Sequence, residues 1–110
     1  MTSRHLDDLR KMIKSRKLII ISEEEGDDFL VSAVWVIENR AGKKIRLIFE
    51  GMSDLSVSPI EQSYACRINE DGAESLYFGK NNKTEWRRNL NAFIGRLDIL
   101  LDPRKLNAAR

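Results

Sequence analysis

Two apolar segments joined by a short turn constrain the fold of this chain more than any other feature. Residues 29–38 (FLVSAVWVIE) are apolar at both alternating sets of positions, so we expect a strand covered on both faces near the centre of a sheet. Residues 43–50 alternate between apolar and charged side chains, as a strand with one buried face does. Residues 39–42 (NRAG) supply the turn, and together these segments predict an antiparallel hairpin.

The residues before the hairpin predict a helix, a strand and a loop. Apolar side chains at spacings of three and four indicate an amphipathic helix over residues 3–16. Residues 18–21 (LIII) are rich in β-branched side chains and too few for a helix, so we expect a strand. Residues 22–28 (SEEEGDD) are polar and carry five carboxylates, which favours an acidic loop.

The residues after the hairpin predict two further strands. Pro59 cannot donate a backbone hydrogen bond, so the chain should pause or bulge there and resume as a strand over residues 60–68. Residues 69–72 (NEDG) end in the Asp-Gly pair that tight hairpins favour. Residues 73–79 then complete a second hairpin.

The last element is a helix with clear start and stop signals. Asn82 is an N-cap with Glu85 three positions later. Apolar residues follow on one face: Trp86, Leu90, Phe93, Ile94, Leu97, Leu100 and Leu101. Pro103 ends the helix, and residues 103–110 are expected to form a frayed tail.

The order of these elements predicts an α+β fold, an antiparallel β-meander of about five strands with an N-terminal and a C-terminal helix packed on it. A chain of 110 residues with 42% hydrophobic residues fits a single domain over residues 1–110. No apolar run approaches the roughly 20 residues that span a bilayer. The charged N-terminal residues lack the apolar segment of a secretory signal, so we expect a cytoplasmic protein without a membrane partner.

Few residues offer catalytic or metal chemistry. Cys66 is the one cysteine and His5 the one histidine, which excludes an internal disulfide and a Cys/His zinc site. We expect Cys66 to be buried and His5, near the start of an amphipathic helix, to face solvent. Neither a P-loop nor a GxGxxG sequence is present. The sequence therefore predicts a protein that is not an enzyme and needs no cofactor.

The net charge of +2 hides a division along the chain. Residues 1–22 carry six basic and two acidic side chains, a net charge of +4. Residues 23–79 carry five basic and twelve acidic side chains, a net charge of −7, and residues 80–110 carry eight basic and three acidic ones, a net charge of +5. Such asymmetry bears on binding partners through the electric field it creates.

The acidic middle suggests a surface that binds a basic protein, because complementary charge raises association rates and fixes register. A nuclease is such a partner, since a row of carboxylates can occupy its phosphate-binding cleft. A solvated loop that blocks edge pairing and aids solubility is the simpler alternative. The candidate contacts are Glu23, Glu24, Glu25, Asp27 and Asp28, with Glu70, Asp71 and Glu74 at the neighbouring turn.

The basic ends suggest an alternative function, nucleic-acid binding, because lysines and arginines on the exposed faces of the terminal helices could track a phosphate backbone. The candidate contacts are Arg87, Arg88 and Arg96 of the last helix, with Arg10, Lys11, Lys14 and Lys17 at the first. Sheets that grip single strands display basic residues and stacking aromatics, whereas the strand segments here are acidic, which disfavours this alternative.

A small α+β chain with segregated charge and no catalytic constellation resembles the small immunity proteins of bacterial toxin systems, including contact-dependent growth inhibition. The resemblance is one of architecture and charge character over the whole chain. It implies a protein that binds a cognate toxin in the cytoplasm and blocks its active site or its access to substrate. Because no motif is shared, the resemblance assigns no binding residues.

Overall fold

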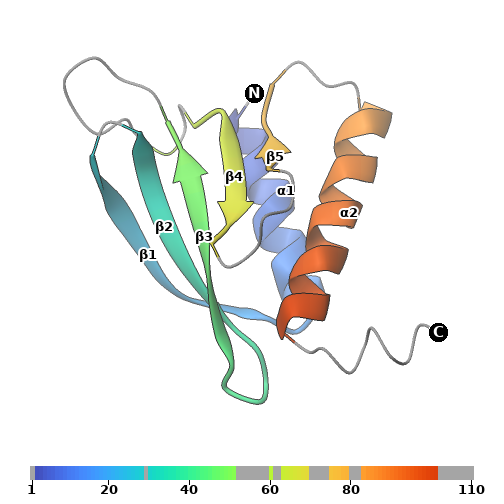
Figure 1. The fold of residues 1–110 in the computed structure, drawn as a ribbon. Helices are drawn as coiled ribbons and strands as arrows, with labels where there is room; N and C mark the ends of the chain where they lie inside the picture. The colour runs from blue at the N-terminus through green and yellow to red at the C-terminus, as the bar shows by residue number, and fades with distance from the viewer. Residues whose placement is uncertain are drawn as a thin grey trace.

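The computed structural model of the protein describes residues 2–28, 30–51, 60, 63–69, 75–79 and 83–101, with the backbone alone at 2, 3, 27 and 28. Its elements are α1 (Thr2–Ser15), β1 (Ile19–Asp28), β2 (Val31–Glu38), β3 (Lys44–Glu50), β4 (Ala65–Ile68), β5 (Leu76–Tyr77) and α2 (Lys83–Leu101). The strands pair antiparallel in the order β1-β2-β3-β4-β5, and both helices lie on one side of the sheet (Figure 1). The predicted α+β meander with a helix from each end is confirmed.

The hydrophobic core lies between the two helices and one face of the sheet. Directly paired residues of antiparallel strands share a face, and the register pairs Trp35 with Leu47 and Phe49 with Cys66. None of these four side chains is more than 1% exposed. The helices complete the core with Leu6, Leu9 and Ile13 of α1 and with Trp86, Leu90, Phe93, Ile94, Leu97 and Leu101 of α2. The predictions that Cys66 is buried and that the C-terminal apolar stripe packs on the sheet are confirmed.

The opposite face of the sheet is not covered by either described helix. On β2, Val34 and Val36 point to this face and are half-buried, and Leu30 just before the strand is 49% exposed. β2 is the second strand from an edge, and β3 is the middle one. The expected strand near the centre of the sheet is therefore present as an interior strand, but its second face is half-buried and not fully covered. Its apolar pattern reflects β-branched residues that also suit a half-exposed sheet surface.

β1 continues through the acidic segment that the sequence predicts to be a loop. The paired residues are Glu23 with Trp35, Glu24 with Val34 and Glu25 with Ala33. The loop prediction for residues 22–28 is wrong, because strand pairing uses backbone groups and an edge strand leaves its charged side chains in solvent.

β4 and β5 are shorter than the strands predicted over residues 60–68 and 73–79. The last residue of β3, Glu50, pairs with Ala65, and its carbonyl also accepts a hydrogen bond from the N–H of Tyr64 over 2.9 Å, so the β3–β4 ladder ends at this point among the described residues. The predicted pause at Pro59, the N-cap Asn82 and the tail at 103–110 lie outside the described residues.

The end of α1 is closed by backbone hydrogen bonds. The N–H of Leu18 donates to the carbonyl of Ile13 over 3.2 Å, and the N–H of Lys17 donates to that of Lys14 over 3.0 Å. Lys17 has a φ of 62°, so this is a Schellman-type cap with a lysine in the left-handed conformation. The reversal directs the chain from α1 straight into β1.

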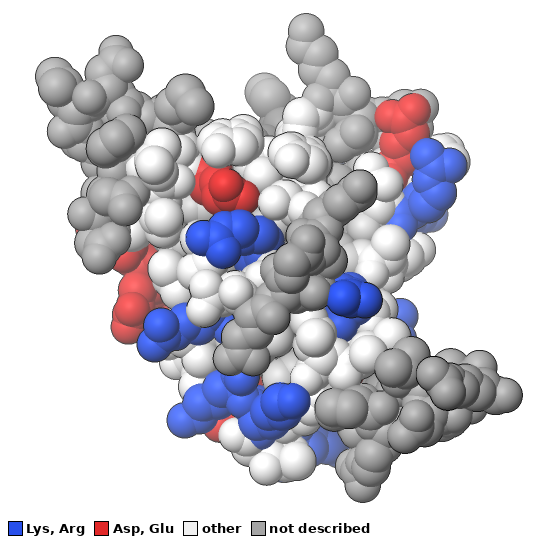
Figure 2. Space-filling view, viewed as in Figure 1, with Lys and Arg blue, Asp and Glu red and all other residues white. Residues whose placement is uncertain are grey.

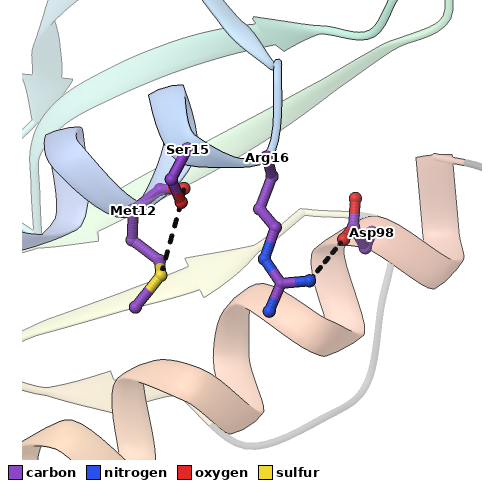
Figure 3. A network of polar contacts seen from close by, with 4 residues as sticks. All are labelled: Met12, Ser15, Arg16 and Asp98. Atoms are coloured by element: carbon purple, nitrogen blue, oxygen red, sulfur yellow. Dashed lines mark hydrogen bonds and ion pairs between the residues drawn. The ribbon is translucent and has the colours of Figure 1, made fainter.

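Two tertiary contacts hold α2 in place. The β2–β3 turn caps its C-terminus, because Asn39 Nδ2 donates to the carbonyl of Leu101 over 2.9 Å and Lys43 Nζ to that of Leu100 over 2.8 Å. Arg16 reaches from the end of α1 to Asp98 over 3.4 Å (Figure 3). Neither described helix is long and apolar enough to cross a membrane.

Candidate functional site

The predicted acidic site lies on an edge of the sheet. Glu23, Glu24 and Glu25 occupy the middle of β1, and the backbones of Asp27 and Asp28 end it. Within the described residues no strand pairs with the outer side of β1, so its backbone N–H and C=O groups there are free to pair with an added strand. The other predicted contacts, Glu70, Asp71 and Glu74, lie outside the part of the chain that the structure describes.

The three glutamates point to both faces of the sheet. Glu23 and Glu25 pair with the buried Trp35 and Ala33, which places them on the helix side. Glu24 pairs with Val34 and points to the open side. All three side chains are exposed, so the edge is acidic on both of its faces.

Glu23 forms an ion pair with α1. Its carboxylate accepts two hydrogen bonds from the Arg10 guanidinium, at 2.5 and 2.6 Å. The same guanidinium lies over the ring of Trp35, 4.4 Å from its centroid. The hydrogen bonds from Arg10 lower the pKa of the Glu23 carboxyl. Since both side chains are more than a third exposed, solvent screens the pair, and Glu23 and Arg10 support the fold by about 1 kcal/mol or less.

Among the side chains of this segment that the structure describes, Glu24 and Glu25 are the carboxylates available to a partner. Ser22 donates a hydrogen bond to Glu24 over 3.3 Å, and no described cation pairs with Glu24 or Glu25. Ile19 and Ile21, at 57% and 43% exposure, precede them on β1. The edge therefore presents an apolar beginning and an acidic middle.

The exposed isoleucines were not predicted from the sequence. The run at residues 18–21 indicates a strand without showing which side of it is covered. Strand pairing is irregular between Ile20 and Ser22, and this irregularity alters the alternation at Ile21. A strand with four apolar residues in a row is the only local signal, and it does not distinguish an edge from a centre.

Gly26 allows the acidic end of β1 to approach β2. A Cβ atom at Gly26 would lie 1.6 Å from the carbonyl oxygen of Val31, far inside van der Waals contact. The pairing of β1 with β2 is irregular here, between Glu25 and Asp28. The path of the strand next to its exposed carboxylates therefore depends on the absence of a side chain.

The predicted basic contacts Arg87, Arg88 and Arg96 are exposed but do not form one cluster. Arg96 lines a groove of about 420 Å³ beside β5, whereas Arg87 lines a groove of about 320 Å³ beside α1. Nine residues along a helix correspond to a rotation of about 180°, so these two side chains lie on opposite flanks of α2. Figure 2 shows basic side chains across the lower centre and over α2, whereas acidic ones lie at the left margin, in the upper centre and at the upper right.

The residues considered for catalysis are buried. Cys66 is fully buried, and burial raises the pKa of its thiol well above the usual range, which disfavours the reactive thiolate. The prediction that His5 faces solvent is wrong, because its ring packs 4.0 Å from that of Trp86 and is 8% exposed. Burial lowers the pKa of His5. Within the described ranges no three His, Cys, Asp or Glu residues are placed to hold a metal ion.

Comparison of the chain with protein-family models, with curated proteins and with solved structures finds no match.

Proposed function

We propose that this protein is a non-catalytic binding module, an immunity protein that binds a cognate bacterial toxin in the cytoplasm and neutralises it. The observation that carries the proposal is the exposure of Glu24 and Glu25, without described ion-pair partners, on the free edge of β1. A surface of this kind suits a basic toxin domain, with a nuclease as the leading candidate. Complementary charge then accelerates binding and selects the partner.

The protein would inhibit a nuclease by occupying the site at which the nuclease binds its substrate. A nuclease holds the phosphates of its substrate with lysines and arginines, and carboxylates placed among those cations compete for the same contacts. Ile19 and Ile21 supply exposed apolar surface next to the carboxylates. We expect the toxin to cover this apolar surface with apolar residues that lie beside its basic cleft. The contact therefore combines charge, which sets the association rate, with apolar burial, which slows dissociation.

Capture of a partner from the native host, followed by affinity measurement, tests this proposal. We compare Glu24→Gln/Glu25→Gln with Asp7→Lys, an exposed carboxylate on α1. Each variant raises the net charge by two, since the first removes two negative charges and the second replaces one negative charge by a positive one. We expect about tenfold weaker binding for the β1 variant, mostly in the association rate, and little change for Asp7→Lys. Equal losses, or none in the β1 variant, contradict the assignment of this edge.

Neutralisation is tested by growth. Bacteria that express the captured partner should stop growing, and co-expression of the wild-type chain should restore growth. The Glu24→Gln/Glu25→Gln variant should restore it less well than Asp7→Lys at equal protein levels. A partner that is harmless when expressed alone argues against an immunity function.

A further inference from the structure

A second charged surface lies on the helix side of the molecule, away from the β1 edge. Lys11 of α1 and Arg87 of α2 line the two walls of a groove of about 320 Å³ between the helices. Arg87 also lines an adjoining hollow of about 480 Å³ along α2, together with Lys83 and Arg88. We call these four residues, Lys11, Lys83, Arg87 and Arg88, the basic helix face.

Among the described residues no carboxylate forms an ion pair with any of the four cations of the basic helix face. The one acidic residue in the groove, Asp8, accepts a hydrogen bond from Trp86 Nε1 over 2.9 Å. By contrast, Arg10 and Arg16 on the same helix region are paired with Glu23 and Asp98. The four cations are therefore not neutralised by ion pairs within the described part of the fold.

Neutral polar groups accompany the cations in the hollow along α2. Thr84 and Asn91 lie there with Lys83 and Arg88, whereas Ser15, in the groove with Lys11, donates its hydroxyl hydrogen to the Met12 carbonyl over 2.7 Å. Hydroxyl and amide groups beside lysine and arginine are the groups that bind phosphate oxygens in protein–nucleic acid contacts. Lys83 and Arg87 are one helical turn apart, about 6 Å along the axis, so they can contact successive anionic groups of an extended ligand.

We propose that the basic helix face binds the phosphodiester backbone of nucleic acid. An acidic amphipathic helix fits less well, because such a helix needs an apolar groove in which to bury one face. The apolar side chains of the groove are Trp86 and Leu90, which are 6% and 3% exposed, and the half-buried Met12, too few to receive the apolar face of a helix. The four cations around them are exposed, as phosphate contacts require.

The chemistry of the face also determines what kind of nucleic acid it recognises. The aromatic residue that lines it, Trp86, is buried and cannot stack on a base. Binding therefore depends on backbone charge and not on base sequence, and it should occur with duplexes as well as single strands. This function is separate from the proposed toxin contact, because the residues of the two surfaces do not overlap.

Fluorescence anisotropy with a labelled 20-bp DNA duplex and a 20-nucleotide single strand tests this proposal. If all four cations contact phosphates, affinity for the duplex should fall about 100-fold between 50 and 200 mM salt. Arg87→Glu/Arg88→Glu should weaken binding at least tenfold and make the salt dependence shallower. Arg40→Glu/Arg46→Glu is the matched control, because it changes net charge equally at two exposed arginines elsewhere. It should retain affinity within about twofold.

The possible outcomes separate the alternatives. Absence of binding at 50 mM salt overturns the proposal, and so do equal losses in the two double variants, since net charge alone would then be responsible. Tighter binding of a glutamate-rich amphipathic helical peptide that DNA does not displace would reassign the face to an acidic protein. Glu24→Gln/Glu25→Gln should bind DNA as well as the wild type does, which distinguishes failure here from failure of the toxin contact.

Discussion

The acidic edge strand and the basic helix face use charge in different ways. On β1, Glu23 is held by two hydrogen bonds from Arg10, whose guanidinium covers Trp35, so part of the acidic segment belongs to the fold. On the basic helix face, no ion pair is found among the described residues for Lys11, Lys83, Arg87 or Arg88. Charge density alone therefore does not identify a binding surface. The presence or absence of an ion-pair partner is the better indicator, because a charged side chain that is already paired within the protein interacts only weakly with a ligand.

The largest expected effect comes from Gly26→Ala, which alters the acidic strand without changing its charge. The added methyl group clashes with the Val31 carbonyl and forces the backbones of β1 and β2 apart. We expect a loss of about 3 kcal/mol in the free energy of unfolding, measured by urea denaturation. Gly95→Ala is the control, since its Cβ meets nothing within 4 Å in α2 and should stabilise by about 0.5–1 kcal/mol. Equal effects would show that the close approach at Gly26 is unimportant.

Arg10→Ala tests whether Glu23 is used by the fold. The variant removes the ion pair and uncovers one side of the Trp35 ring, so we expect a loss of about 1 kcal/mol and a red shift of tryptophan fluorescence. Arg46→Ala, at an exposed arginine of the open sheet face, should change stability by less than about 0.5 kcal/mol. If the two variants behave alike, the distinction between paired and unpaired cations fails.

The pH dependence of stability tests the interface beneath the basic helix face. Because burial lowers the folded-state pKa of His5 below its usual value of 6.5, the unfolded chain takes up the proton first as the pH falls. Stability from His5 is therefore complete above pH 6.5 and is lost as the pH falls through the lowered pKa. Thermal melts at pH 8 and pH 5.5 should show the loss, and His5→Phe should reduce it. The Glu23 carboxyl, with a pKa lowered from 4.5, titrates below this range.

The smallest expected effect comes from Arg87→Gln. Lys83 and Arg87 are like charges one helical turn apart, so removing one should raise stability by about 0.3 kcal/mol at low salt. Arg16→Gln should act in the opposite direction, because it leaves the buried carboxylate of Asp98 without its guanidinium partner. Chemical denaturation at 20 mM and 500 mM salt measures both variants. A stabilising effect of Arg87→Gln that persists at high salt would not be electrostatic.

Local patterns predicted the types and order of the elements. The stripe from Trp86 to Leu101 lies within one helix and the hairpin of residues 29–50 within two neighbouring strands, so each signal is local and its side-chain period must agree with burial. The acidic segment misled the prediction, because polar residues are typical of loops and also of edge strands. Its assignment to β1 depends on pairing with residues ten positions further along the chain.

The candidate sites were predictable as residue types but not as surfaces. Charge counts located the acidic and basic segments, but they did not show that Glu23 of the acidic segment pairs with Arg10 of the basic segment before it. Arg87 and Arg96 are close in sequence, yet the rotation of the helix separates them. The prediction that His5 is exposed was wrong because the residue that covers it, Trp86, comes from the other terminal helix, and this contact has no local signal in the sequence.

Side-chain periodicity and composition were enough to predict the types and order of the elements, the apolar stripe of α2 and the segregation of charge, because each of these is a property of a local stretch of chain. The tertiary structure alone decided which strand lies at the edge, which charges are paired and which remain for a ligand. These properties depend on contacts between residues distant in the chain, whose geometry is set by the packing of both helices on one face of the sheet.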